Sequence, residues 1–426
     1  MEEAVIVSGA RTAVGAFAGA LKGVKVVDLG ALVIGEAIRR AGLRPAVNDL
    51  NRSCRPDNGP EETKITGVSG TFDSSLTPAY FDECIMGNVL QAAQGQNPAR
   101  QASIYSGLPV ETNAWTLNMV CASGMKAIAL AAGAIWSGTA EAVIAGGMEN
   151  MTNAPYALNE ARFGYRMNMP FGQVTDLMVY DGLYEIFNGY HMGQTAENIA
   201  QRYGITRAEQ DELALISHQR ALAAIRSGLF AEEIIPVPIP QKKGDPIFFQ
   251  VDERPMETSL EKLARLSGAF IKNGTVTAGN ASGINDGAAA VVVMSGSRAR
   301  ELGLNPLARI KGFAMGGVDP AYMGLGPIPA TRKLFKKLNI TMADIDLVEL
   351  NEAFACQALA CIRELKVDPA FCNVNGSGIS LGHPIGATGA RITYGLAMEM
   401  QRRDVNLGLA ALCIGGGQGM ALVLER

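Results

Sequence analysis

Short apolar runs recur along the chain, and most of them end in glycine or in a polar turn. They cover residues 4–7, 142–145, 288–294 and 409–414. None of these runs alternates with polar residues, which is the pattern of strands that are buried on both faces. The pattern therefore predicts a sheet that is covered by helices on both sides.

Helical patterns lie between these runs. Asp28 is a suitable N-cap for a helix that continues to about residue 40. Thr206 and Glu209 form a capping box, and the helix that follows should continue to about residue 227, before Gly228. Strands followed by helices of this length predict an α/β fold.

One pattern occurs twice along the chain. Residues 82–88 resemble residues 345–351, and each copy ends in an asparagine, Asn88 and Asn351. A glycine- and serine-rich helix start follows each asparagine at the same distance, at Cys121 (121 − 88 = 33) and at Pro384 (384 − 351 = 33). Two copies of one α/β unit would place these positions at equivalent strand-to-helix turns, where open α/β sheets bind ligands.

Residues 47–80 differ from the rest of the chain. They are rich in Asn, Asp, Ser, Thr, Pro and Gly, and they lack helical or strand periodicity. We predict a long surface loop or flap, although structureless loops of this length are uncommon in compact domains.

Composition excludes several classes of protein. The chain has 426 residues, and 48% of them are hydrophobic, so we expect a folded protein. Its net charge is −4 and it has no basic stripe, so we do not expect it to bind nucleic acid. No apolar run approaches the ~20 residues of a membrane span, and the acidic start does not resemble a secretory signal. The seven cysteines include no CxxC pair, which favours reduced thiols in the cytoplasm over zinc or disulfides.

Cys121 is the first residue with a chemical role to consider. It precedes a predicted helix at residues 127–136, and the small residues Ala122, Ser123 and Gly124 follow it. Main-chain N–H groups at a helix start favour a thiolate, so Cys121 is a candidate nucleophile. The alternative is a small buried apolar residue that has only a packing role.

The other reactive candidates also lie in glycine-rich segments. His383 precedes Pro384 within residues 375–389, and it could act as the base for a thiol. A nucleotide loop is disfavoured there because no Lys-Ser/Thr pair follows.

Cys413 ends a predicted strand, and the glycines after it could supply N–H groups for an oxyanion hole. The alternative is that Cys413 is a packed cysteine of the strand without a chemical role. His191 also lies in a glycine-containing segment, whereas we expect His218 on an exposed helical face.

The sequence around these residues resembles the thiolase family. Asn-Met-Val-Cys-Ala-Ser-Gly at 118–124 looks like the nucleophile motif of that family. Further family motifs follow in order at 146–151, 191–198, 277–283, 323–327, 351–354, 375–389 and 413–417. The resemblance runs from residue 5 to the end of the chain and is interrupted only near 47–80, where the chain is longer than is usual in the family.

The resemblance implies a role for each catalytic residue. Cys121 would accept the acyl group, and His383 would activate it and help to bind the thioester oxygen. Cys413 would remove a proton from the methyl group of the second acetyl-CoA. Asn351 would hold a water that joins His383 in one oxyanion hole, and the N–H groups of Cys121 and Gly415 would form a second.

The resemblance also implies a binding site for the acyl group and the pantetheine of CoA. The residues at the matching positions are His191, Met192, Leu183, Phe270, Ala278, Ser282, Met323, Ala353 and Phe354. Arg254 is a candidate for contact with the CoA nucleotide. The other basic residues between 240 and 272 are expected to be solvated: Lys242, Lys243, Lys262, Arg265 and Lys272.

The fold that the resemblance implies has two similar α/β halves in five layers, αβαβα, with an inserted loop domain. Residues 1–150 would form the N-terminal half, completed by about 283–303. Residues 151–282 would form the loop domain that covers CoA, and residues 304–426 the C-terminal half. A homotetramer built from dimers is also implied.

The implied activity is that of an acetyl-CoA C-acetyltransferase, which converts two acetyl-CoA into acetoacetyl-CoA and CoA. The coenzyme A thioesters are substrates, so no cofactor or metal is expected. One alternative is a broader 3-ketoacyl-CoA thiolase, although His-Met-Gly at 191–193 resembles the short-chain branch. A ketoacyl synthase is disfavoured because a cysteine occupies the position of the second base. A non-catalytic acyl-CoA- or lipid-binding relative would be expected to lack Cys121, His383 or Cys413.

Overall fold

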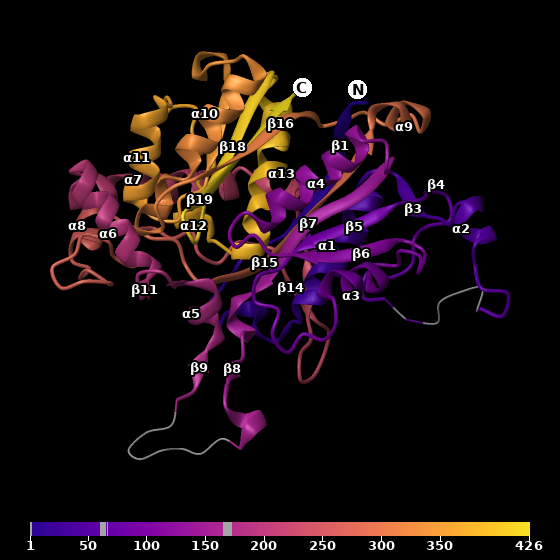
Figure 1. The fold of residues 1–426 in the computed structure, drawn as a ribbon, viewed down its shortest axis with the longest axis horizontal. Helices are drawn as coiled ribbons and strands as arrows, with labels where there is room; N and C mark the ends of the chain where they lie inside the picture. The colour runs from indigo at the N-terminus through magenta and orange to yellow at the C-terminus, as the bar shows by residue number, and fades with distance from the viewer. Residues whose placement is uncertain (1, 60–64, 66, 165–172) are drawn as a thin grey trace.

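The computed structural model describes residues 2–59, 65, 67–164 and 173–426 (Figure 1). Its main feature is a sheet of eleven strands with the order β17-β18-β19-β16-β1-β15-β7-β5-β6, to which β2 (Gly15–Ala16) and β12 (Ile234–Ile235) pair at the side. The strands of the main path are β1 (Ala4–Thr12), β5 (Glu83–Gly87), β6 (Asn113–Leu117), β7 (Ala142–Asn150), β15 (Asn285–Ser295), β16 (Ala308–Gly317), β17 (Leu347–Leu350), β18 (Leu407–Ile414) and β19 (Gln418–Glu425).

The two halves of the sheet have the same arrangement. In the first half β5 pairs in parallel with β7, and β7 pairs antiparallel with β15. In the second half β17 pairs in parallel with β18, and β18 pairs antiparallel with β19. The segments 82–88 and 345–351 contain β5 and β17, so the repeat predicted from the sequence is confirmed.

Helices cover both faces of each half. Along β18 and β19, Leu409 and Val423 pack in a cluster with α10 (Pro327–Leu338) and α11 (Ala355–Leu365), whereas Leu412 and Leu422 pack in the largest cluster. That largest cluster also contains α4 (Ser123–Trp136) and α13 (Ile385–Arg403). In the first half, α1 (Val26–Arg40) and α3 (Pro98–Tyr105) cover the opposite face. The helices α4 and α13 therefore form the central layer of a five-layered fold, as predicted.

The central helices approach so closely that only glycine fits at their contact. A Cβ atom on Gly124 of α4 would lie 2.7 Å from the main-chain nitrogen of Ala390. A Cβ atom on Gly389 of α13 would lie 2.5 Å from the main-chain nitrogen of Met125. Since both neighbours are main-chain atoms, the distance between the two helices is fixed by the backbone.

The chain between β7 and β15 consists mainly of helices and short hairpins. Near the sheet are α5 (Leu177–Gly182), the hairpin β10 (Tyr184–Glu185) with β11 (Tyr190–His191), α6 (Met192–Tyr203), α7 (Arg207–Arg226), the hairpin β13 (Val237–Ile239) with β14 (Ile247–Phe249), and α8 (Leu260–Ala264). The paired strands β8 (Tyr156–Ala157) and β9 (Thr175–Asp176) extend away from the body (Figure 1). Two further short helices outside this segment are α9 (Gly296–Glu301) and α12 (Gly378–Leu381).

Two local predictions are corrected. Helix α1 begins at Val26 after Lys25, so Asp28 lies in the first turn rather than at the cap. Within 47–80 the structure contains α2 (Asp49–Ser53) and β4 (Thr77–Ala79), which pairs with β3 (Leu43–Pro45), so a wholly irregular loop is wrong. Residues 60–64 and 66 of this segment lie outside the described residues.

The capping box of Thr206 and Glu209 before α7 is confirmed. In the described part of the chain, no helix is long and apolar enough to cross a membrane.

We predict that Gly389→Ala lowers the midpoint of urea unfolding, because the added methyl group meets the backbone of α4. Overpacking of this kind typically costs about 1–3 kcal/mol. Gly395→Ala is the matched control, because it lies in the same helix and its Cβ would meet no heavy atom within 4 Å. The control should be unchanged or more stable, since alanine is the better helix former. Equal midpoints for the two variants at the same protein concentration would contradict a backbone-limited contact.

Candidate active site

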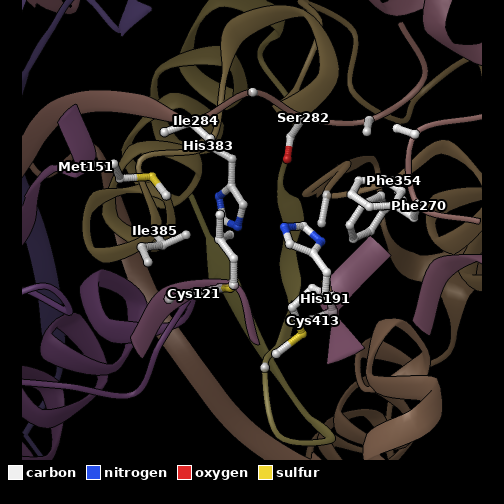
Figure 2. Close-up of a pocket in the computed structure, with 18 of the residues that line it drawn as sticks. Cys121, Met151, His191, Phe270, Ser282, Ile284, Phe354, His383, Ile385 and Cys413 are labelled. Atoms are coloured by element: carbon white, nitrogen blue, oxygen red, sulfur yellow. The ribbon is translucent and has the colours of Figure 1, made fainter. Parts of the chain in front are cut away.

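A cavity of about 300 Å³ lies where both halves meet the segment between β7 and β15. Figure 2 shows that the labelled side chains of Cys121, His383, His191 and Cys413 gather around one central space. Of the residues predicted for catalysis or binding, all except Asn351 line this cavity. Residues that are far apart in the sequence therefore form one site.

Cys121 lies two residues before the first residue of α4, in a strained turn. The preceding residue, Val120, has a φ of 45°, which β-branched residues rarely adopt. Side chains hold the turn in this conformation, because the Oγ of Ser123 accepts from the N–H of Met119 at 2.8 Å and the Oδ1 of Asn118 accepts from the N–H of Val120 at 2.9 Å. The turn fixes the direction in which the thiol points.

Burial makes the thiol of Cys121 a weak acid. The side chain is almost fully buried, and loss of water raises the pKa of Cys121 to about 11. The main-chain N–H groups of Gly415 and of Cys121 itself oppose this rise in pKa, but they do not outweigh it. The N–H groups thus favour the thiolate, as expected, but burial has the larger effect on the pKa, so Cys121 needs a base.

His383 lies two residues before α13 and is held on two sides. Its main-chain N–H donates to the Oδ1 of Asn285 at 3.0 Å, and its Nδ1 lies 2.8 Å from the Oγ1 of Thr388. Its Nε2 has no hydrogen-bond partner among the described residues. Burial, together with the nearby Arg391, lowers the pKa of His383 to about 3, so the imidazole is neutral and can accept a proton.

Cys413 and Gly415 complete the reactive side of the cavity. Cys413 is fully buried near the end of β18, and burial raises its pKa well above the ordinary value, with a further contribution from Cys121. The main-chain N–H of Gly415 lowers the pKa of Cys121. Gly416 and Gly417 have φ values of 83° and 84°, a conformation that glycine adopts without strain. This turn brings the second thiol and the N–H of Gly415 to the first thiol.

Asn351 is not one of the residues that line the cavity. It follows β17 directly, is fully buried, and its main-chain N–H donates to Ala411 at 2.9 Å. Within the described residues, neither its Oδ1 nor its Nδ2 has a hydrogen-bond partner. Buried amides are normally satisfied, so these two atoms are available to a water.

Apolar residues form the opposite wall. The ring of His191 stacks on Phe270 with centroids 4.8 Å apart, and Phe270 meets Phe354 edge to face at 6.1 Å. Gly193 permits this packing, because a Cβ atom there would lie 2.1 Å from the ring of Phe270. The remaining predicted residues that line the cavity are Leu183, Met192, Ala278, Ser282, Met323 and Ala353.

Arg254 lines the cavity, but its guanidinium is bound to the protein main chain. Its Nε donates to Ile379 at 2.6 Å, and its Nη2 donates to Ala281 at 2.8 Å. Its contact with a nucleotide therefore stays a prediction. The five neighbouring cations that we expected to be solvated are exposed: Lys242, Lys243, Lys262, Arg265 and Lys272.

His218 differs from its prediction. Only 1% of its surface is exposed, because α7 packs against α12 and α11 as well as α8. Its Nδ1 accepts from the main-chain N–H of Met256 at 3.3 Å. Burial, with a contribution from Arg254, lowers the pKa of His218 to about 4. The exposed helical face expected for this residue is therefore wrong.

Sequence reasoning also missed several residues of the site. The additional residues that line the cavity are Met151, Gly182, Ala269, Ala281, Gly283, Ile284 and Ile385. Met151 and Ile385 belong to the motifs at 146–151 and 375–389, so their positions could have been included. Ala269 lies outside every motif, and only the fold brings it to the cavity.

Glu149 is a buried carboxylate that connects the segments of the site. It accepts hydrogen bonds from Asn88 Nδ2 and from the main-chain N–H groups of Val89, Leu90 and Gly386, at 2.8–3.1 Å. Burial raises the pKa of Glu149 to about 7, against the lowering effect of the three N–H groups. Because Gly386 lies in the first turn of α13, Glu149 fixes the start of this helix to the loop after β5.

Known proteins resemble the whole chain. The family model of the thiolase N-terminal domain matches residues 71–297, and the family model of the thiolase C-terminal domain matches residues 304–426. An acetyl-CoA acetyltransferase of Escherichia coli K12 is 52% identical, and one of Cupriavidus necator is 50% identical; in both cases the match covers 100% of each chain. The crystal structure of the Bacillus anthracis acetyl-CoA acetyltransferase matches with a TM-score of 0.88 and 44% identity, over 100% of this chain and 99% of that one.

Proposed function

The chain belongs to the thiolase family, and on that premise we propose that it is an acetyltransferase that joins two acetyl-CoA molecules into acetoacetyl-CoA and CoA, reversibly. The observation that carries the proposal is that Cys121, His383 and Cys413 all line one cavity. Two thiols and a neutral imidazole are the groups that acyl transfer followed by proton abstraction requires.

In the first step Cys121 attacks the thioester carbon of acetyl-CoA. The proton of its thiol passes to Nε2 of His383, the bond from sulfur to the acetyl carbon forms, and the bond to the sulfur of CoA breaks. His383 then returns the proton to the departing CoA thiolate. The pKa values support this order, because a thiol with a raised pKa needs a base and an imidazole with a lowered pKa gives the proton back readily.

In the second step Cys413 first passes its thiol proton to Nε2 of His383, and the resulting thiolate takes a proton from the methyl group of another acetyl-CoA. The enolate attacks the acetyl carbon on Cys121, and acetoacetyl-CoA forms as the bond from that carbon to the sulfur of Cys121 breaks. His383 gives its proton to this sulfur, which restores the thiol of Cys121 and the neutral imidazole. Fixed hydrogen-bond donors must stabilise the oxygen of the enolate. A water held by Asn351 would donate to the enolate oxygen together with His383, whose Nε2 is protonated at this stage. The N–H groups of Cys121 and Gly415 would bind the oxygen of the acetylated cysteine.

The rest of the cavity would bind the substrate. The apolar wall of His191, Phe270 and Phe354 would contact the acyl group and the pantetheine, while Ser282 and Ala278 lie at the predicted pantetheine positions. Arg254 would act near the nucleotide end. No cofactor is needed for these steps, because the thioesters are themselves the substrates.

The larger organisation belongs to the same proposal. The N-terminal half would comprise residues 1–150 together with about 283–303, because β15 pairs with both β1 and β7. Residues 151–282 would cover CoA, and residues 304–426 would form the second half. A homotetramer built from dimers and a cytoplasmic location are the further parts that the family resemblance supports.

The proposal predicts that Cys413→Ser separates the two steps. Acetyl exchange between acetyl-CoA and labelled CoA needs Cys121 and His383, so it should be largely retained. Condensation also needs the base for the methyl group, and its rate should fall by about 10²–10⁴-fold, as is typical for loss of acid–base catalysis. Both rates are measured on the same preparation of the variant.

Cys84→Ser is the matched control, because Cys84 is equally buried but belongs to the cluster around α1, away from the cavity. It should leave the ratio of the two rates unchanged. If Cys413→Ser slowed exchange and condensation equally, Cys413 would have only a structural role and the two-cysteine mechanism would fail.

We also predict a preference for four-carbon substrates. Met192, Met323 and Phe354 line the cavity of about 300 Å³, and we expect them to limit the acyl chain, so that added methylenes clash rather than gain the ~0.8 kcal/mol each that an open pocket provides. The measurement is kcat/KM for thiolysis of acetoacetyl-CoA and of a ten-carbon 3-ketoacyl-CoA. Equal values would instead support the broader 3-ketoacyl-CoA thiolase.

A further inference from the structure

The hydroxyl of Thr388 forms hydrogen bonds with the main chain and with the side chain of His383. Thr388 lies in the first turns of α13 and is fully buried. Its Oγ1 is 2.9 Å from the carbonyl oxygen of Pro384 and 2.8 Å from Nδ1 of His383. The hydroxyl therefore bridges a main-chain carbonyl and the imidazole.

The position of the hydroxyl proton determines the state of the ring. A carbonyl oxygen cannot donate, so two oxygens 2.9 Å apart attract each other only if the proton of Thr388 lies between them. Threonine in a helix commonly donates to the carbonyl four residues earlier. The hydroxyl then has no proton for His383, and Nδ1 must donate to it.

A neutral imidazole carries one proton, so Nε2 of His383 has a free lone pair. The surroundings of Nε2 agree with this assignment. Nε2 is buried without a hydrogen-bond partner in the described part of the chain, and the residue lines the cavity. The opposite tautomer would bury an unsatisfied N–H at the same place, and it would leave two acceptor oxygens facing each other at 2.9 Å.

His191 provides a contrast across the same cavity. Its Nδ1 accepts from the main-chain N–H of Gly193 at 3.0 Å, so its Nε2 carries the proton in the neutral ring. Figure 2 shows the two imidazoles near each other. One ring thus offers a lone pair and the other an N–H, and in each case a short-range contact on Nδ1 sets the tautomer.

We propose that Thr388 is a positioning residue that holds His383 in the Nδ1–H tautomer, so that Nε2 is ready to take the proton of Cys121. This inference rests on the proposed function. The proton of the thiol passes to Nε2 as the new sulfur–carbon bond forms, and it passes on to the CoA thiolate as the old bond breaks. Thr388 accepts from Nδ1 throughout and need not move.

The test compares Thr388→Val with Thr388→Ser. Valine has nearly the same shape but leaves Nδ1 without an acceptor, whereas serine keeps the hydroxyl. We expect Thr388→Val to slow the acetylation of Cys121 by acetyl-CoA in a single turnover by roughly 10–100-fold, which is less than the roughly 10²–10⁴-fold typical for complete loss of acid–base catalysis, because His383 itself is still present. Thr388→Ser should remain within a few-fold of the unmodified protein, and the dissociation constant for CoA should be unchanged in both.

A spectroscopic measurement reads the tautomer without depending on activity. The chain contains three histidines, so ¹⁵N-labelled imidazoles give few signals, and His383→Gln assigns the one in question. In the unmodified protein and in Thr388→Ser, Nε2 of His383 should have the shift of an unprotonated nitrogen. In Thr388→Val it should shift toward a protonated nitrogen.

The outcomes separate the two hypotheses. A protonated Nε2 in the unmodified neutral ring would overturn the role of Thr388 even if Thr388→Val did not fold. Acetylation of Thr388→Val at the unmodified rate would overturn it as well. If the unmodified protein were not acetylated at all while Nε2 had the expected shift, the proposed function would fail and the tautomer assignment would stand.

Discussion

The close contact of α4 with α13 is the constraint on which the site depends. Cys121 and His383 each lie two residues before one of these helices, so the distance between the helix starts sets the distance between the two groups. Glycines at 124 and 389 let the backbones meet, and larger residues would separate them. Glu149 adds a second restraint, because it binds the first turn of α13 to the loop that follows β5. The repeated α/β unit thus places two helix starts side by side and makes one site from them.

Burial is the second physical feature of the site, and it decides the charge of every reactive group. Cys121, His383 and Cys413 are buried, so the thiols have raised pKa values and the imidazole has a lowered one. A permanent thiolate–imidazolium pair is therefore disfavoured, and charge should form only while a substrate reacts. Fixed N–H donors, such as that of Gly415, are most effective in such dry surroundings, because they need no reorganisation when the charge appears.

The sequence predicted more of the site than of its electrostatics. The apolar runs and the repeat predicted the sheet and its turns. The motifs predicted that His383 and Cys413 belong to one site, because glycine-rich turns after buried strands have a characteristic local pattern. The raised pKa of Cys121 could not be predicted, because a helix start is visible in the sequence, whereas burial by other segments is not. His218 and Arg254 show the same limit. Their partners lie 38 and 125 positions away along the chain (256 − 218 and 379 − 254), and only the tertiary fold brings them together.

The central claim is that the paired helix starts form a site in which Cys121 carries an acetyl group. The most direct measurement is intact-protein mass spectrometry after incubation with acetyl-CoA, followed by peptide mapping, on the unmodified protein and on Cys121→Ala. The account predicts one acetyl group, located on Cys121, that is removed by added CoA and is absent from Cys121→Ala although this variant retains Cys413. An adduct that persists in Cys121→Ala together with turnover, or the absence of any acetyl group on Cys121 in the active unmodified protein, would contradict it.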